Sequence, residues 1–162
     1  MMTDTVQTHG PEATQRLGES LAEYLLPGDC IPLIGEMGCG KTCFVQGIAR
    51  GLCVPETMPV NSPSFTLVNR YPGRLMLFHV DLYRLNSPDQ LDDIELDELI
   101  RSDGVILIEW PAIAADKLTG AVMWIEFAWD MTHEMVRRLT FRSDCHRFKP
   151  FFEELRRDCA GY

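Results

Sequence analysis

The chain has 162 residues, of which 46% are hydrophobic and 24% charged, and its formal net charge at pH 7 is −9. This length and composition predict a single domain over residues 1–162, because two domains of ordinary size would not fit. The acidic balance and the presence of only three lysines argue against a protein that grips nucleic acid with its own surface. We therefore expect any contact with RNA to be indirect, through a partner protein.

The cysteines and the N-terminus indicate a cellular compartment. The six cysteines form no C-x-x-C pair, which favours reduced thiols. Residues 1–14 show no charged region followed by an apolar run, and no apolar stretch approaches the roughly 20 residues that span a bilayer. The sequence therefore predicts a cytoplasmic protein without an export signal or a membrane segment.

The first half of the chain predicts a strand, a glycine-rich loop and a helix in succession. Helical spacing of apolar residues predicts a first helix over 11–26. The apolar run 30–34 predicts a strand, and apolar residues at helical spacing over 44–52 predict a second helix. Between them, residues 35–42 (GEMGCGKT) match the phosphate-binding pattern G-x-x-x-x-G-K-[ST]. This context favours a true phosphate-binding loop over a chance match.

The second half predicts further strands and two helices. Strands over 65–71 and 75–80 are expected to form a hairpin through the turn at Pro72-Gly73, and an acidic helix is predicted over 88–100. The most apolar strand candidate is 105–108. Further strands are expected over 121–129 and 135–141, and a closing helix over about 148–158. Together these elements predict an α/β fold, a single P-loop NTPase domain whose mixed β-sheet is flanked by helices, with its core over about 11–142.

The glycine-rich loop predicts a nucleoside triphosphate site. Its backbone N–H groups would surround phosphate oxygens at the positive end of the following helix. Lys41 would reach the outer phosphates, and the hydroxyl of Thr42 would ligate Mg²⁺. The candidate nucleotide-binding residues in this segment are Gly35, Glu36, Met37, Gly38, Cys39, Gly40, Lys41, Thr42 and Cys43.

Two carboxylates complete the candidate metal and catalytic site. Asp81 and Glu109 each end an apolar strand candidate, and ligands of open α/β sheets bind at the carboxyl ends of strands. With Thr42 they form the candidate metal set, and with Lys41 the candidate catalytic set. One carboxylate could hold metal while the other orients water, and this division stays open. The hydroxyl-rich segment 62–67 is either a γ-phosphate sensor or an ordinary turn.

Four segments in order carry a specific resemblance: GEMGCGKT, SPSFTLVNRY, HVDLYRL and IEWP. This set closely resembles the TsaE family, the small ATPase of bacterial tRNA threonylcarbamoyladenosine synthesis, and the similarity runs to about Trp129. The resemblance implies ATP and Mg²⁺ as cofactors and the proteins TsaB and TsaD as partners, the latter the threonylcarbamoyl transferase. It also implies nucleotide roles for Lys41 and Thr42, a magnesium role for Glu109, and a site role for Asp81. Thr66 falls in the switch-like segment and is a further nucleotide-binding candidate.

The chain departs from the family pattern at several positions. Cys39 and Cys43 stand where the family usually has alanine and threonine, and Ser64 where threonine is common. Glu95 and Leu99 replace a glycine and an aromatic residue before the IEWP strand. Cys39 raises a redox hypothesis, because a thiol at a helix N-terminus can have a lowered pKa, although a space-filling role is favoured.

The leading functional hypothesis is a Mg²⁺-dependent ATPase that acts within a tRNA-modifying complex. Hydrolysis by the chain alone is expected to be weak, because no arginine is evidently placed as a finger, although Arg70 and Arg84 remain open. The alternatives are a small-molecule P-loop kinase and an interaction protein gated by nucleotide. His79 is expected to be packed or hydrogen-bonded rather than catalytic. Trp110 is expected either to lie in the core or to shape the site or a partner surface.

Overall fold

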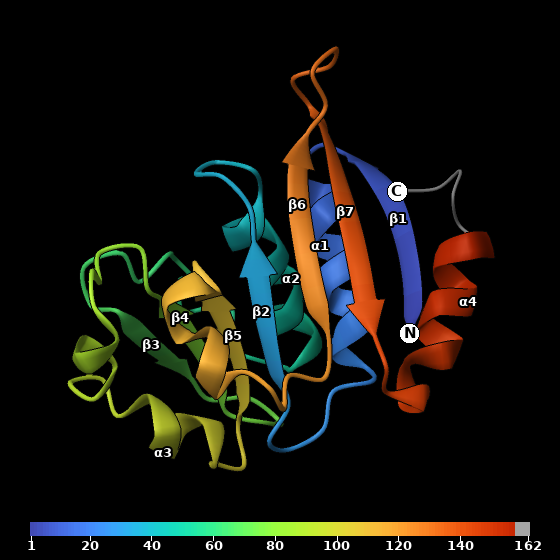
Figure 1. Ribbon diagram of the computed structural model, residues 1–162. Helices are drawn as coiled ribbons and strands as arrows, with labels where there is room; N and C mark the ends of the chain where they lie inside the picture. Colours follow the sequence, from blue (N-terminus) through green and yellow to red (C-terminus); the bar gives the residue numbers. More distant parts are fainter. Residues whose placement is uncertain (158–162) are drawn as a thin grey trace.

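A seven-stranded sheet with the strand order β1-β7-β6-β2-β5-β4-β3 runs through the computed structural model, which describes residues 1–157 (Figure 1). The central strand β2 lies parallel to β5 and β6, and β4 is parallel to β5. The other three pairings are antiparallel, so the predicted α/β fold with a mixed sheet is confirmed. The strands are β1 (Met2–His9), β2 (Cys30–Ile34), β3 (Val68–Tyr71), β4 (Leu77–Asp81), β5 (Val105–Glu109), β6 (Trp124–Trp129) and β7 (Val136–Ser143).

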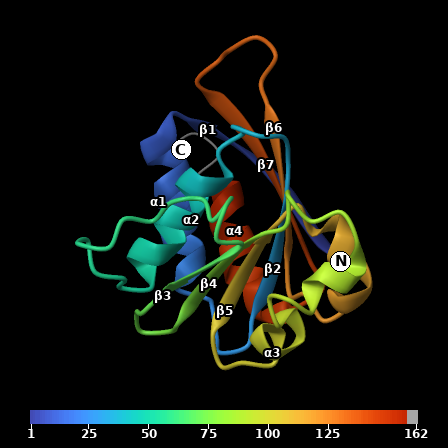
Figure 2. The ribbon, with the colours of Figure 1, turned by 90° about the vertical axis from the view of Figure 1, so that its left-hand side faces the viewer.

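Helices cover both faces of this sheet (Figures 1 and 2). One face carries α1, α2 and α4, and their apolar residues, such as Leu17, Phe44 and Phe151, form one core cluster with Ile31 and Leu33 of β2. The helices are α1 (Pro11–Ala22), α2 (Lys41–Gly51), α3 (Leu96–Ile100) and α4 (Lys149–Arg157), with the 3₁₀ helices η1 (Pro88–Leu91), η2 (Pro111–Lys117) and η3 (His146–Phe148). The α1 helix ends at Ala22, earlier than predicted.

The other face of the sheet is covered by the short helices that follow β4 and β5. Leu91 of η1, Leu99 of α3 and Ala114 of η2 form a second core cluster with Ile106 and Ile108 of β5. Because β5 is buried on both faces, its sequence is apolar at every position before its last residue. Because the two core clusters pack against opposite faces of the sheet, the ends of β4 and β5 are held in place.

Two glycines allow α1 and α2 to pack in close contact. A Cβ atom added at Gly47 would lie 2.0 Å from the carbonyl oxygen of Gln15, and one added at Gly18 would lie 2.4 Å from that of Phe44. Neither position has room for a larger residue. The contact holds α2, which begins at the end of the glycine-rich loop, against the body of the domain.

The edge strand β1 was not expected from the sequence. Its residues alternate, with Val6 and Thr8 buried and Thr5, Gln7 and His9 exposed. That pattern is typical of a half-buried strand, but it has only one large aliphatic residue in its interior and offers a weak hydrophobic signal. Pairing with β7 over its whole length stabilises it.

Besides α1, and β6, which begins at Trp124 instead of residue 121, two further predicted elements are shorter than expected. Left-handed backbone explains these two. Leu67 has φ +64° and its N–H donates to the carbonyl of Pro63, so the segment before it turns and β3 begins only at Val68. Glu95 has φ +52° and divides the predicted helix 88–100 into η1 and α3. Glycine adopts this conformation more easily than glutamate. This would account for the glycine that the resemblance implies at this position.

The remaining boundaries lie near their predicted positions. Strands β3 and β4 form the predicted hairpin, with Val68 opposite Val80 and Tyr71 opposite Leu77. The closing helix α4 spans Lys149–Arg157, and the last residue predicted for it, 158, lies outside the described residues.

Candidate functional site

The glycine-rich loop joins the end of β2 to the start of α2, as the sequence predicts. Gly35 leaves the strand with φ +154°, and an added Cβ there would lie 2.8 Å from the carbonyl oxygen of Phe127 on β6. Gly40 has φ +104° in the left-handed region directly before α2. These conformations turn the chain back on itself and place the N-terminus of α2 at the carboxyl edge of the sheet.

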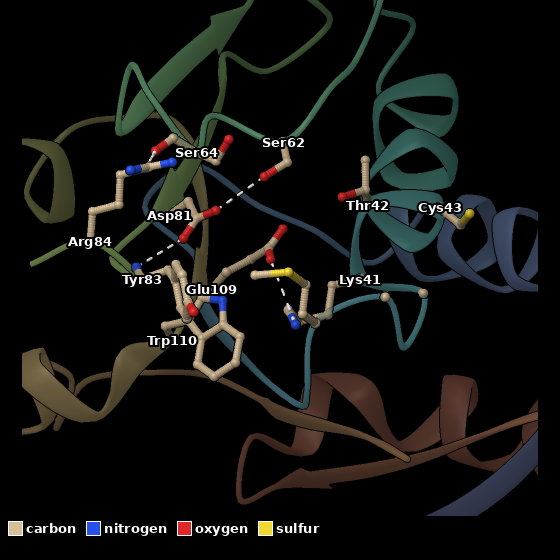
Figure 3. Close-up of a pocket in the computed structure, with 13 residues that line it drawn as sticks. Lys41, Thr42, Cys43, Ser62, Ser64, Asp81, Tyr83, Arg84, Glu109 and Trp110 are labelled. Carbon is tan, nitrogen blue, oxygen red and sulfur yellow. Dashed lines mark hydrogen bonds and ion pairs between the residues drawn. The ribbon is translucent and has the colours of Figure 1, made fainter. Parts of the chain in front are cut away.

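A cavity of about 470 Å³ lies beside this loop (Figure 3). It collects residues from the loop, from the start of α2, from the segment between α2 and β3, from the ends of β4 and β5, and from the segments that follow these two strands. Its lining residues are Met37, Gly38, Gly40, Lys41, Thr42, Cys43, Ser62, Ser64, Asp81, Tyr83, Arg84, Glu109 and Trp110. The cavity therefore brings together the three segments that the sequence analysis selected separately.

Lys41 is the first residue of α2, and its side chain is almost fully buried. Its ammonium group donates to the carbonyl oxygens of Gly35 and Glu36, at 2.7 Å and 2.9 Å. It also lies 3.8 Å from Oε2 of Glu109 and 4.7 Å from the centroid of the Trp110 ring. The positive charge is thus held at the floor of the cavity by the loop on one side and a carboxylate on the other.

The two predicted carboxylates are direct neighbours in the sheet. Asp81 ends β4 and Glu109 ends β5, and the two residues are paired in the register of these parallel strands. Both are buried apart from their edge on the cavity, with 4% of each residue exposed. Because parallel strands end at the same edge, side chains that are far apart in sequence meet here.

The two carboxylates have different partners. Asp81 accepts hydrogen bonds from the Ser62 hydroxyl to Oδ2 at 3.0 Å and from the Tyr83 backbone N–H to Oδ1 at 2.9 Å. Glu109 accepts a bond to Oε1 from Nε2 of His79 at 2.8 Å, which leaves Oε2 facing Lys41. Asp81 is therefore tied to both adjoining loops, whereas Glu109 presents one oxygen to the cavity.

The hydroxyl-rich segment contributes two serines to the cavity. Ser62 and Ser64 line it, and the carbonyl of Ser64 accepts a hydrogen bond of 2.7 Å from Nε of Arg84. The guanidinium of Arg84 also stacks 4.2 Å above the ring of Phe65. Thr66, a predicted nucleotide-binding residue, does not line the cavity; it is exposed and donates to Oδ1 of Asn69. The turn that delays β3 directs its side chain elsewhere.

Three of the loop candidates, Gly35, Glu36 and Cys39, do not line the cavity. Gly35 and Glu36 contribute the carbonyls that hold Lys41, and both border a separate groove beside Trp124 of β6. Cys39 is fully buried, and its Sγ lies 3.8 Å from the Lys41 ammonium. Met37 is 64% exposed at the mouth of the cavity.

The two thiols at the loop, Cys39 and Cys43, both have a raised pKa. Burial raises the pKa of Cys39 despite the nearby Lys41 ammonium, and burial likewise raises the pKa of Cys43. The lowered pKa required by the redox hypothesis is therefore not found, and the buried position of Cys39 fits its space-filling role.

Trp110 and Tyr83 form one wall of the cavity. Their ring centroids lie 4.9 Å apart, and Trp110 has a left-handed backbone with φ +57° directly after Glu109. Trp110 is half-buried; it packs against the second core cluster and also lines the cavity. Its ring also covers the Lys41 ammonium.

Sequence reasoning missed the arginine that approaches the loop from β7. The guanidinium of Arg137 stacks 4.0 Å above the ring of Trp129, and Arg137 lines a smaller cavity with Pro11 and Met135. That cavity shares Gly38, Gly40 and Cys43 with the main one. No local motif marks Arg137, because only the pairing of distant strands places it beside the loop.

The oxygen atoms around the cavity fit a magnesium ion that would be bound by protein groups and by phosphate oxygens together. Among residues 1–157, no group of three or more His, Cys, Asp or Glu side chains could hold a metal ion. Mg²⁺ is commonly bound through one or two carboxylates together with substrate phosphates, and the Thr42 hydroxyl, Asp81 and Glu109 provide such a set.

In the same described part of the chain, no helix is long and apolar enough to cross a membrane.

Comparisons with known proteins agree on one family. The family described as "Threonylcarbamoyl adenosine biosynthesis protein TsaE" matches residues 8–139. A protein of Bacillus subtilis named tRNA threonylcarbamoyladenosine biosynthesis protein TsaE is 36% identical over 152 residues, covering 93% of this chain and 92% of its own. A Treponema pallidum protein of the same name is 42% identical over 105 residues, covering 65% of this chain and 76% of its own.

The fold leads to the same group of proteins. The crystal structure of YdiB from Bacillus subtilis superposes with a TM-score of 0.75 at 29% identity, over 96% of this chain and 95% of that one. Together with the loop, the paired carboxylates and their common cavity, these matches show that the chain belongs to the TsaE family.

Proposed function

We propose that this protein is a Mg²⁺-dependent ATPase that supports the transfer of a threonylcarbamoyl group to the adenosine beside the anticodon of tRNA, in a complex with TsaB and TsaD. The observation that carries the proposal is the convergence of Lys41, Thr42, Asp81 and Glu109 on one cavity at the start of α2. The relatives are named for tRNA threonylcarbamoyladenosine biosynthesis, which supports the pathway.

The phosphate chain of ATP is proposed to bind across the N-terminus of α2. Backbone N–H groups of the loop and the helix dipole favour an anion at this point. The Lys41 ammonium, now bonded to the carbonyls of Gly35 and Glu36, is proposed to exchange part of these contacts for the outer phosphate oxygens. Its burial near Glu109 keeps the charge close to the bond that is cleaved.

The metal is proposed to be held by the Thr42 hydroxyl and the Oε2 atom of Glu109. Magnesium would supply neutralisation of the charge that develops on the phosphate oxygens. Asp81 already accepts bonds from Ser62 and the Tyr83 backbone, so we assign it the role of holding these loops at the cavity and orienting water. We propose this division of roles for the alternative that the sequence left open.

The nucleoside is proposed to occupy the smaller cavity. This cavity adjoins the main one through Gly38, Gly40 and Cys43, so a nucleotide with its phosphates at Lys41 can extend its base toward Arg137 and Met135. The Arg137 guanidinium, stacked on Trp129, offers a flat cationic surface to an aromatic base.

Reconstitution with the cognate TsaB and TsaD proteins tests the proposal. ATP turnover and the formation of threonylcarbamoyladenosine on tRNA are measured together, with wild type, Lys41→Ala and Glu109→Ala. The proposal predicts that the partners stimulate turnover and that both substitutions abolish turnover and repeated modification. Modification that proceeds unchanged with both variants would contradict it, and transfer of phosphate to a small acceptor instead of water would favour a kinase.

A further inference from the structure

A buried histidine lies directly behind Glu109. His79 is on β4, two residues before Asp81, and none of its surface is exposed. In the register of the sheet it lies opposite Leu107, two residues before Glu109 on β5. Since residues two apart in a strand share a face, the side chains of His79, Asp81 and Glu109 all point to the face covered by α2. His79 does not line the cavity.

The hydrogen-bonding state of His79 is defined by its surroundings. Nε2 lies 2.8 Å from Oε1 of Glu109. An ionised carboxylate only accepts hydrogen bonds, so Nε2 carries the proton and donates. Among the residues that the structure describes, Nδ1 is a buried atom without a hydrogen-bond partner. The imidazole therefore fits this site with its Nε2 atom as the donor to Glu109.

A histidine is an unfavourable residue at this core position. Burying a polar ring costs free energy unless its nitrogen atoms form hydrogen bonds. Here Nε2 forms one and Nδ1 has no partner among the described residues. Neighbouring residues on the same face, such as Leu77 and Leu107, are apolar and fully buried. Within residues 1–157, the bond to Glu109 is the one polar contact that the imidazole makes, and an apolar side chain could not form it.

We infer that His79 is a positioning residue that fixes the carboxylate of Glu109, so that Oε1 is held in the core and Oε2 is presented to the metal. The inference rests on the proposed role of Glu109 in the function above. By occupying Oε1, His79 limits the rotation of the carboxylate. The other oxygen, Oε2, lies 3.8 Å from Lys41 and is left for the metal. Residues that orient metal-binding groups in this way typically change metal affinity by about 10- to 100-fold when they are replaced.

The test compares two substitutions that differ in the donor. His79→Gln can place its amide N–H near the position of Nε2, whereas His79→Leu has no donor. Leu77→Ala, on the same strand and face, is the control for a core defect that leaves the Glu109 contact intact. Mn²⁺ affinity is measured by electron paramagnetic resonance with the protein–ADP complex, and metal-free ADP affinity and thermal stability are measured in parallel.

We expect His79→Leu to weaken Mn²⁺ binding by about 10-fold or more, with metal-free ADP affinity unchanged, and His79→Gln to restore most of the loss. Leu77→Ala should lower the melting temperature without this effect on metal. Equal Mn²⁺ affinity in His79→Leu and wild type, or an equal loss in Leu77→Ala, would overturn the inference. Wild type that binds Mn²⁺ no better with ADP than without it would instead overturn the proposed function, and the inference with it.

A second readout needs no metal. ¹⁵N-detected NMR of the imidazole reports which ring nitrogen carries the proton. We expect the proton of His79 on Nε2 in wild type and a changed Nε2 shift in Glu109→Gln. A proton on Nδ1 would overturn the inference whatever the metal measurements give.

Discussion

The ammonium group of Lys41 and the carboxylate of Glu109 lie 3.8 Å apart, and only 4% and 5% of these side chains are exposed. Two residues that lie 68 positions apart in the sequence thus form a nearly buried pair of opposite charge. In a site of low dielectric constant, such charges would act strongly on the phosphate group that is proposed to bind beside them.

Replacement of Lys41 by methionine should remove the charge while keeping an unbranched side chain. We expect ATP turnover to fall by about 100-fold or more, which is the usual cost of losing one preorganised electrostatic group. The matched control is Lys117→Met, because Lys117 pairs with Asp97 on the surface near α3. The rate of steady-state ATP hydrolysis is measured for both variants. Similar turnover in Lys41→Met and Lys117→Met would contradict the proposed role of Lys41.

Arg137 and Arg138 provide a matched pair for the proposed base site. Arg137 lines the smaller cavity, whereas Arg138 is exposed and, as the next residue of β7, points to the opposite face. We expect Arg137→Ala to weaken ADP binding by about 5- to 10-fold through loss of stacking, and Arg138→Ala to have no effect. Isothermal titration calorimetry measures both, and an equal change in the two variants would rule out the base site.

Close packing of α1 on α2 should be sensitive to a single methyl group. Because a Cβ at Gly47 would lie 2.0 Å from the carbonyl oxygen of Gln15, we expect Gly47→Ala to lower the free energy of unfolding by about 1–3 kcal/mol or more. A Cβ at Gly120 would meet nothing within 4 Å, so Gly120→Ala is the control. Urea denaturation gives both values, and a stability of Gly47→Ala equal to wild type would show that the helices can move apart.

The pH dependence of stability should reveal the buried thiol of Cys30. Burial, with a smaller contribution from Asp29, raises the pKa of Cys30 from 9.0 to about 12. The folded state therefore keeps the proton while the unfolded state loses it above pH 9.0, so this contribution to stability is complete below pH 9.0 and is lost as the pH rises toward 12.

We expect wild type to lose on the order of 1 kcal/mol more than Cys30→Ala between about pH 8 and about pH 10. Chemical denaturation at a series of pH values checks this difference. Parallel pH curves for the two proteins would mean that the thiol ionises equally in the folded and unfolded states.

Much of the fold and site follows from local sequence patterns. The glycine-rich loop at Gly35–Thr42 has a fixed spacing, and β5 is an uninterrupted apolar run that ends in Glu109. Both signals are contained in a few adjacent residues, and so are recognisable without a structure. The proximity of Asp81 and Glu109 follows from such local signals together with a general rule, because parallel strands end at a common edge.

The parts that sequence analysis missed depend on contacts between distant segments or on unusual backbone. Arg137 reaches the loop only because β6 and β7 pair and β6 lies beside β2. The left-handed conformations of Leu67 and Glu95 shorten two predicted elements and direct Thr66 away from the cavity, and neither residue type favours that conformation. The mainly polar composition of β1 concealed an edge strand.

The measurement that tests the central claim most directly is the rate of ATP hydrolysis as a function of Mg²⁺ concentration, for wild type and Glu109→Gln, with the TsaB and TsaD partners present. Glutamine keeps the size of the side chain and removes its charge. The account predicts Mg²⁺-dependent hydrolysis by wild type, and for Glu109→Gln a turnover lower by about 100-fold together with a higher Mg²⁺ requirement. Equal turnover and equal Mg²⁺ dependence in the two proteins would contradict it.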